Sequence, residues 1–579
     1  MKNYYAIELE YLRELGAEYA REHPAIAPLL ATRSTDPDVE RLLEGTAFLC
    51  GLINERLDQN FPEVIQTFLD ITAPELLRPS PSQTLIQFQP LPQVQGVQTL
   101  AAGSALESTP VSGISCTYTI PREQRIVPVT SAVSLLEDRS PDAATLHLRL
   151  RSSAPLAAWW TGSLQLHLHD ELSRACQWFY LLLNKCTRIR LEAAGTVLSL
   201  SPDALVPDIV ARDAAEAFAA SGSGTSSPLP GSLSAAWLRN YFILPEQFLF
   251  LRLEGGRSLS RTENAHQLDI FFRLQDCRDL PAHLAPDLLR CNVSWAINLF
   301  AHSSDPFILN QNRQEYRLVP HKDPGRTLEI YTIRRVTGLK RGLKPHVYEP
   351  YTRFSSSPQT GTYVVRRARS PVNGRMDLYI SLLYAGNQGP QAGETLSSEL
   401  LCFQHTLPLQ LREGDISQAT DSSPAMATFS NIVPPTPPFP APDSSEQQWR
   451  LFSSLHANML SLADAKALKE FLTLWLPVRD PDPTHATLNR QRIEAVQDFE
   501  ARQEERLFRG RPLRGLHLLV RLNGDCFVRT GDRYLFGLIL NEVLSRYATI
   551  NTCTRLEVQD TRTGESLTWT PRLGSRRLL

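Results

Sequence analysis

His167 and His169 form the part of the sequence that comes nearest to a metal-binding motif. Alternate residues of a strand face the same side of a sheet, so the two imidazoles could converge on one ion. Asp170 would point to the opposite side, and the neighbouring sequence offers no third ligand. Histidines that alternate with leucines are typical of the polar face of an amphipathic strand. The pattern therefore predicts a strand rather than a metal site.

Other motifs that could do chemistry are incomplete. The stretch from Gly338 to Lys344 is similar to a phosphate-binding loop, but it is one residue short and its lysine is displaced. Pro345 stands where a magnesium-binding hydroxyl belongs. Ser115 has a glycine two residues before it but none two residues after it, so the nucleophile motif of hydrolases is absent. The sequence predicts no catalytic residue, no metal and no cofactor.

A basic stretch interleaved with aromatic residues is the strongest electrostatic feature. Between residues 334 and 375 the one acid is Glu349. The ten cations are Arg334, Arg335, Lys340, Arg341, Lys344, Arg353, Arg366, Arg367, Arg369 and Arg375, and the aromatic residues are Tyr348, Tyr351, Phe354 and Tyr363. Such a surface can grip a nucleic acid and stack its bases, or dock an acidic protein, or simply be solvated. We retain Arg334, Arg335, Lys340 and Arg341 as candidate interaction residues.

The first 78 residues are predicted to be helical and are acidic, with fourteen Asp and Glu against seven Lys and Arg. The sequence Asp36-Pro37-Asp38 is typical of a helix start, because it combines an N-cap, a proline and an acid near the positive helix end. Apolar residues recur at helical spacing on both sides of this start. The candidate interaction residues among them are Leu12, Val39, Leu42, Leu49, Ile53 and Leu57. They could close the core of a bundle within this chain or contribute to a bundle shared with a partner chain.

The central part of the chain is predicted to be rich in antiparallel strands. Short alternating runs such as residues 146–150 and 164–169 are separated by Pro, Ser and Gly, which is typical of strands with one solvated face. We expect a β-rich domain over 79–220 with one helix near 171–184, a flexible linker at 221–230, and a second β-rich domain over 231–417.

The last third of the chain begins with a segment of different composition. Residues 418–447 are rich in Pro and Ser and lack periodicity, so we expect a connector that is extended or lies along another surface. Residues 448–579 are predicted to form a mixed α/β domain, with a hairpin across a Thr-Gly turn near its end. Taken together, the patterns predict a multidomain α+β fold: an N-terminal helical segment, β-rich domains with antiparallel sheets, and a mixed α/β C-terminal part.

The overall composition is that of an ordinary globular protein. The chain has 579 residues, of which 42% are hydrophobic and 21% charged, with 59 Lys and Arg against 61 Asp and Glu. These values exclude a wholly disordered chain, a coiled-coil rod and a collagen-like fibre. The near-zero net charge gives no whole-protein argument for a nucleic-acid or membrane partner. At roughly 150 residues per domain, the length predicts about three or four domains.

The cysteines and the apolar runs indicate the compartment. The nine cysteines are odd in number, no two are closer than ten residues, and no C-x-x-C occurs. This spacing excludes a secreted disulfide framework and a zinc ribbon. The first residues lack the apolar region of a signal peptide, and the run at residues 534–540 is far shorter than a membrane span. We expect a cytoplasmic protein without membrane insertion.

Several strings of the sequence, in order from residue 1 to 579, resemble the TssF family. The first are YYAIELEYLRELGAEYAREHPAIAPLL, DPDVERLLEGTAFLCGLINERLDQNFPEVIQTFLD and PELLRPSPS. NLFAHSSDPFILNQNRQEYRLVP and LEIYTIRRVTG follow in the middle, and NIVPPTPP, WRLFSSLHANMLSL, PLRGLHLLV and GDRYLFGLILNEVLSRYATINTCTRLEV follow later. TssF is a baseplate subunit of the bacterial type VI secretion system.

The resemblance implies a structural protein without enzymatic activity. TssF-like proteins form wedges in which two TssF copies associate with TssG around the VgrG spike hub. TssK links the wedge to the membrane complex, and TssE links it to the contractile sheath. The expected location is cytoplasmic, at the inner-membrane-associated baseplate of a Gram-negative bacterium, and no nucleic-acid partner is expected. The alternative function that the residues leave open is a nucleic-acid-binding protein that uses residues 334–375.

Overall fold

The structure is a computed structural model that divides into two compact units. Unit 1 comprises residues 1–72 and 442–453, and unit 2 comprises residues 73–441 and 454–579. The described residues are 2–22, 37–58, 62–208, 230–261, 265–310, 313–322, 327–340, 344–351, 361–370, 375–383, 393–456, 463–508, 511–550 and 552–574.

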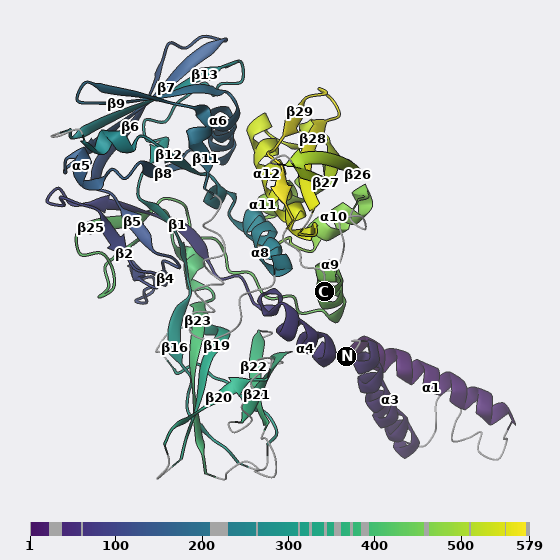
Figure 1. Cartoon of the computed structure of the whole chain (residues 1–579). Coiled ribbons are helices and arrows are strands. Elements are labelled where there is room, and N and C mark those ends of the chain that lie inside the picture. The colour runs from purple at the N-terminus through teal and green to yellow at the C-terminus, as the bar shows by residue number, and fades with distance from the viewer. Residues whose placement is uncertain are drawn as a thin grey trace. The chain divides into compact units, whose positions relative to one another are not determined.

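Unit 1 is helical (Figure 1). Its helices are α1 (Lys2–Glu22), α3 (Pro37–Asp58), α4 (Pro62–Thr72) and the first part of α9 (Ser445–His456). Helix α3 begins at Pro37 and has Asp38 and Glu40 in its first turn, where acids favour the positive end of the helix dipole. Helices α1 and α3 pack side by side.

Unit 2 is built around sheets that we name by a central strand. The β1 sheet has the order β24 (Ile416–Gln418), β3 (Ala105–Ser108), β4 (Thr117–Thr119), β15 (Val293–Ile297), β1 (Gln83–Pro90) and β25 (Ala427–Asn431). The β13 sheet has the order β10 (Thr196–Leu200), β9 (Cys186–Ala193), β13 (Gln267–Gln275), β7 (Ala143–Ser152) and β6 (Val129–Glu137). The β8 sheet has the order β11 (Leu205–Pro207), β12 (Phe250–Glu254), β8 (Ser163–Leu168) and β14 (Leu289–Arg290).

Two further large sheets follow along the chain. The β19 sheet has the order β16 (Phe300–Ser303), β23 (Thr395–Gln404), β19 (Leu328–Leu339), β20 (His346–Pro350), β21 (Thr362–Arg369), β22 (Met376–Leu383) and β18 (Tyr316–Arg317), with β17 (Phe307–Ile308) on β23. The β27 sheet has the order β26 (Val496–Phe508), β27 (Arg511–Leu522), β28 (Thr552–Asp560) and β29 (Ser566–Thr568), with β30 (Arg572–Leu573) on β28. Strands β2 (Gln98–Leu100) and β5 (Gln124–Ile126) form a separate pair.

The helices of unit 2 lie between and beside these sheets. They are α5 (Leu156–Trp159), α6 (Leu172–Asn184), α8 (Pro230–Ile243), α10 (Ala465–Thr473), α11 (Pro483–Glu494) and α12 (Thr530–Tyr547). Short 3-10 helices occur at Pro74–Leu77, Pro202–Ala204, Pro245–Phe248, Arg257–Arg261, Leu407–Gln410 and Gly524–Cys526. The predicted α+β class is confirmed: helices at the N-terminus, mostly antiparallel sheets in the middle, and a mixed sheet with the parallel pair β27–β28 near the end.

The sheets do not follow the boundary that the sequence predicts at 221–230. In the β13 sheet, β13 pairs with β7 on one side and with β9 on the other, so residues 267–275 complete a sheet begun before residue 200. The β1 and β8 sheets likewise combine strands from 79–220 with strands from 231–417. The prediction of two separate β-rich domains is therefore corrected, because pairing between distant strands leaves no local mark on the sequence.

Residues 418–447 are not a free connector. Strand β25 of this segment pairs with β1 over five residues, and Phe429, Ile432 and Phe439 are buried. Residues 442–447 belong to unit 1. The low periodicity of the segment arises because it lies along a surface built by the rest of the chain, which supplies the apolar neighbours that the segment itself lacks.

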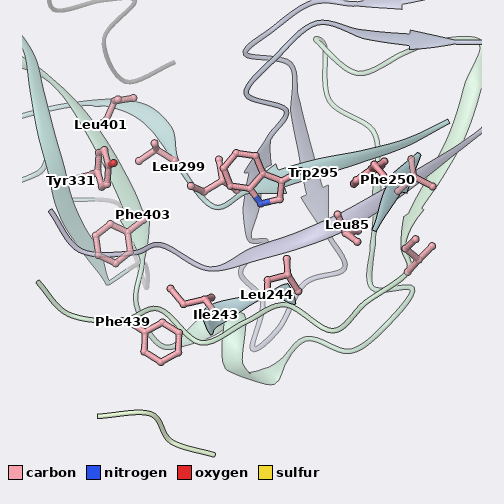
Figure 2. Close-up of a cluster of buried hydrophobic side chains, with 13 residues drawn as sticks. Leu85, Ile243, Leu244, Phe250, Trp295, Leu299, Tyr331, Leu401, Phe403 and Phe439 are labelled. Carbon is pink, nitrogen blue, oxygen red and sulfur yellow. The ribbon is translucent and has the colours of Figure 1, made fainter. Parts of the chain in front are cut away.

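One apolar cluster joins three of the sheets. It brings together Leu85 of β1, Trp295 of β15, Phe250 of β12, Tyr331 of β19 and Phe403 of β23, all buried. Figure 2 shows Trp295 between the side chains of the β19 sheet on one side and Phe250 on the other. Residues near the end of α8 and Phe439 complete the cluster. Because these sheets share a core, they are expected to fold as one unit.

Helix α12 is enclosed by unit 2, and three of its charged side chains are buried. Asp532 forms an ion pair with Arg492 of α11 at 2.9 Å, and Arg533 forms one with Asp560 of β28. Glu542 forms an ion pair with Arg572 of β30. Removing one partner of a buried ion pair costs about 3–5 kcal/mol because the other charge stays uncompensated. These three pairs therefore fix α12 against three separate elements.

The start of α12 approaches α6 so closely that only glycine fits. A Cβ atom at Gly531 would lie 2.3 Å from the carbonyl oxygen of Cys176, and the Gly531 amide donates to Oε1 of Gln177 at 2.9 Å. A contact with backbone cannot be relieved by rotating a side chain. This approach ties the C-terminal part of unit 2 to the first β-rich region.

We expect Gly531→Ala to lower the free energy of unfolding of unit 2 by about 1–3 kcal/mol, because the added methyl group forces α12 and α6 apart. The measurement is urea denaturation followed by tryptophan fluorescence. Gly96→Ala is the control: a Cβ at Gly96 meets no atom within 4 Å, so its effect should stay within about 0.5 kcal/mol. Equal midpoints for Gly531→Ala and the wild type would contradict the close approach.

Candidate functional site

The helix pair in unit 1 buries only a narrow seam. Ala47 and Gly51 of α3 are buried, and such small residues allow the backbones of α1 and α3 to approach closely. Arg13 of α1 forms an ion pair with Glu40 of α3 across the same pair of helices. Leu12, which the sequence predicts as an interaction residue, is half-buried.

The other side of α3 presents apolar residues to solvent. Leu42, Leu49 and Ile53 are 71%, 60% and 59% exposed. Their spacing of seven and then four residues places them on one helix face. The structure thus brings three of the predicted interaction residues together. The side chains of Val39 and Leu57 lie outside the described part of the chain.

Helix α1 carries a second exposed apolar stripe that sequence analysis missed. Ile7, Tyr11, Leu15 and Tyr19 recur every four residues and are all exposed. Glu10, Glu14 and Glu18 form an exposed acidic stripe beside them. The sequence carries this stripe as a strict four-residue repeat, which places the four side chains along one side of the helix.

Helix α4 repeats this arrangement on a smaller scale. Ile65 and Leu69 are buried, whereas Val64, Phe68 and Ile71 are exposed. The ring of Phe68 lies 5.8 Å from that of Phe452 in α9, in the same unit. Each of the three N-terminal helices therefore uses one face for packing within the chain and leaves an apolar face open.

The exposed apolar side chains are concentrated in unit 1. Of the 25 large hydrophobic side chains that are exposed in the described part of the chain, 12 lie in this short unit. Soluble monomers rarely expose contiguous apolar patches of this kind, and such patches mark sites of association. The arrangement can bury apolar area against another chain.

The basic stretch is more neutral in the structure than in the sequence. Arg366 donates to both carboxylate oxygens of Glu315, at 2.9 and 2.6 Å, which lowers the pKa of that carboxyl. Arg375 lies 3.5 Å from Glu329. Both acids come from outside residues 334–375. Glu315, directly before β18, and Glu329 of β19 therefore supply counter-charges that the sequence window omits.

Two of the four predicted cations, Arg334 and Arg335, lie on strand β19, and Lys340 directly follows it. Arg335 is exposed, whereas Arg334 and Lys340 are half-buried. Burial lowers the pKa of Arg334, and nearby Glu399 partly offsets that effect. Arg341 lies outside the described residues. Of the four candidate cations, Arg335 is therefore the one that is exposed in the described part of the chain.

The aromatic residues of the stretch are not arranged to stack on bases. Tyr348 is 2% exposed and Tyr363 is 5% exposed. Burial raises the pKa of Tyr363 to about 12. Tyr351 is exposed, and Phe354 lies outside the described residues. Since base stacking requires an accessible ring face, two of the four rings are removed from a nucleic-acid role.

Gly338 belongs to strand β19 and not to a phosphate loop. A Cβ at this position would lie 1.9 Å from Oε1 of Glu394, a buried carboxylate. Glu394 accepts hydrogen bonds from the Tyr348 hydroxyl at 3.0 and 3.1 Å, and His346 lies 3.0 Å away. This close packing requires a glycine at position 338. The glycine that made the sequence similar to a phosphate-binding loop thus has a packing role.

His167 is a core residue of strand β8. It is 1% exposed, its Nε2 donates to the carbonyl oxygen of Glu246 at 3.1 Å, and its ring lies 4.6 Å from that of Phe250. Burial lowers its pKa to about 3, so the ring is neutral at physiological pH. Burial also lowers the pKa of His169. The described residues contain no group of three or more His, Cys, Asp or Glu that could hold a metal ion.

The thiols offer no reactive nucleophile in the core. All nine cysteines are free, and Cys50 and Cys526 are half-buried while the other seven are buried. Burial raises the pKa of Cys186 to about 11 and that of Cys402 to about 12. A protonated thiol is a poor nucleophile and a poor metal ligand. No helix within the described segments is long and apolar enough to cross a membrane.

The fold and the exposed helices define a class: multidomain α+β proteins that present apolar helix faces suited to association with other chains. Residues 1–576 match the family model described as "Type VI secretion system, TssF". The chain therefore belongs to the TssF family. It is 28% identical to the type VI secretion system component TssF1 of Pseudomonas aeruginosa over 631 aligned residues, which cover 99% of this chain and 98% of the relative.

Two solved structures have a similar fold. A chain of the type VI secretion system TssK-TssF-TssG baseplate subcomplex, determined by cryo-electron microscopy, matches with a TM-score of 0.74 and 24% identity, covering 93% of this chain and 99% of the other. A chain of the baseplate complex from the type VI secretion system matches with a TM-score of 0.64 and 23% identity, covering 100% of both.

The buried state of His167 predicts an acid-sensitive core. Because the folded pKa of about 3 lies below the ordinary value of 6.5, the unfolded chain binds a proton that the folded chain does not, and stability falls as the pH drops from 6.5 towards 3. We expect His167→Gln, which can retain a donor to Glu246, to lose roughly 2 kcal/mol less stability than the wild type between pH 7 and pH 5. The measurement is urea denaturation at each pH.

The exposed histidine His283 supplies the control. His283→Gln should lose as much stability over this pH range as the wild type does. If His167→Gln also kept the full wild-type dependence on pH, the neutral buried ring would not be a source of acid sensitivity.

Proposed function

We propose that this chain is a structural, non-enzymatic wedge subunit of a type VI secretion baseplate. Its family membership supports the secretion system, and the TssK-TssF-TssG subcomplex that contains a similar chain supports TssG and TssK as partners. A second copy of this chain, TssE and VgrG are further proposed partners. The proposed location is the cytoplasmic face of the inner-membrane-associated baseplate in a Gram-negative bacterium.

The observation that carries the proposal is the open apolar face of the N-terminal helices. Residues 1–78 would supply helices to a bundle that is completed by TssG and by the second copy of this chain. Leu42, Leu49 and Ile53 would lie inside that bundle, with Leu12, Val39 and Leu57 contributing to the same core. Burial of a large aliphatic side chain contributes about 1.5–3 kcal/mol relative to exposure.

The charged surfaces fit a protein assembly. The exposed acids of α1 and the exposed Arg335 would meet surfaces of opposite charge on neighbouring subunits, where complementarity fixes which partners associate. Interfaces of moderate size that rely on such polar contacts can separate when the machine fires. The buried rings of Tyr348 and Tyr363 favour this role over nucleic-acid binding.

We expect Leu49→Glu combined with Ile53→Glu to weaken association with co-expressed TssG by about tenfold or more. A carboxylate placed in an apolar bundle loses its hydration without gaining a partner. The measurement is co-purification of the full chain followed by mass determination of the intact complex. The isolated chain should stay folded, because both side chains are exposed in it.

Val528→Glu combined with Ile308→Glu is the matched control. Both residues are exposed to a similar degree but lie in unit 2. This control should retain TssG as the wild type does. If the variant with both substitutions in α3 bound TssG with wild-type affinity, that result would contradict the shared bundle.

A further inference from the structure

The β13 sheet has one face packed within unit 2 and one face open to solvent. On the inner face, Leu148, Ile189, Ile270 and Phe272 are buried, and α6 packs against strands β9 and β13 (Figure 1). The intervening residues of the same strands point the other way, as the alternation of a strand requires. This outer face is part of neither the exposed N-terminal helices nor the basic stretch.

A rigid row of side chains crosses the centre of the outer face. The strand register places Arg190, Phe271 and His147 side by side on β9, β13 and β7. The guanidinium of Arg190 lies 4.4 Å above the Phe271 ring, and His147 stacks on the other side with ring centres 4.2 Å apart. The ring nitrogens of His147 lie 2.9 Å from Glu137 and 2.7 Å from Asp269. The row is held in place before any partner arrives.

Two arginines next to this row oppose each other without an acid between them. Arg188 of β9 and Arg273 of β13 are directly paired in the register, and both are exposed. Arg188 donates to the Ser199 hydroxyl at 3.1 Å. Within the described segments, neither guanidinium forms an ion pair with a carboxylate, and neither does that of Arg151 farther along the face. Like charges directly opposite each other on neighbouring strands are destabilising.

Exposed apolar residues lie on the two edge strands of the same face. Val197 of the edge strand β10 is 56% exposed, and Leu135 of the opposite edge strand β6 is also exposed. The register aligns Leu135 with His147 in the central row, and Val197 with Glu192 in the neighbouring row. The outer face therefore combines unneutralised cations with apolar contact area, which is the composition of a protein interface that also steers its partner electrostatically.

We propose that the outer face of the β13 sheet docks an acidic protein surface whose carboxylates pair with Arg188 and Arg273. A carboxylate placed between the two guanidiniums would accept hydrogen bonds from both and remove their repulsion. Glu192, Asp269 and Glu137 lie on the same face, and they would repel the continuous phosphate charge of a nucleic acid. A protein partner can present isolated carboxylates that avoid them.

The test is a double charge reversal, Arg188→Glu with Arg273→Glu, in the full chain. The tagged chain is co-expressed with TssG, TssK, TssE and VgrG and purified at about 0.1 M salt, where charged contacts are only partly screened. We expect one subunit to be lost roughly tenfold or more while the others are retained. Reversing the acidic residues of that subunit to lysine should restore its binding to the variant.

Arg490→Glu with Arg529→Glu is the control, since both arginines are exposed in unit 2 and the charge change is the same. It should retain every subunit. Arg188→Gln with Arg273→Gln provides a milder variant if the double reversal fails to fold by circular dichroism, and it should lose the same subunit.

Three results would overturn the inference. They are retention of all subunits by both Arg188/Arg273 variants, loss of bound nucleic acid instead of a subunit, and a fall from two copies of this chain to one in the mass of the complex. The inference relies on the proposed function for the choice of partners, but the two fail differently. A wild-type chain that captures none of these subunits would contradict the proposed function itself.

Discussion

The burial of charge on helix α12 is the constraint on which the rest of unit 2 depends. A helix with Asp532, Arg533 and Glu542 in its interior-facing turns is stable only when each charge meets its partner. Those partners lie on α11, β28 and β30. At the start of the helix, the backbone of α6 comes so close that only a glycine fits. The buried position of the helix therefore depends on elements more than 350 residues apart along the chain.

The two units differ in how far they bury their apolar and charged side chains. Unit 2 closes its cores, pairs its buried charges and shares one apolar cluster among three sheets. Unit 1 buries a seam between α1 and α3 and leaves apolar faces open on three helices. Unit 2 therefore buries its own apolar side chains, whereas unit 1 exposes apolar surface that is suited to association. In the proposed assembly, unit 2 would present fixed surfaces, such as the outer face of the β13 sheet, while other chains would complete the helices.

Local patterns predicted the parts of the fold that depend on neighbouring residues. The start of α3 at Pro37 and the hairpin of β28 and β29 follow from capping and turn chemistry within a few residues. The pairing of β1 with β25, about 340 residues apart, has no such signal, and neither has the acid Glu315 that neutralises Arg366. The helical periodicity placed Leu42, Leu49 and Ile53 on one face of α3, but their exposure depends on where the neighbouring helix packs, which the sequence does not show.

The free cysteines have a practical consequence for following this protein as it assembles. Seven of the nine thiols are buried, and the two half-buried ones fall in different units: Cys50 on α3 and Cys526 in unit 2. Thiol-reactive dyes should therefore attach preferentially at these two native positions, without engineered cysteines. A donor and an acceptor fluorophore there would turn the separation between the two units into a single-molecule distance signal, readable while a baseplate is built and when it fires.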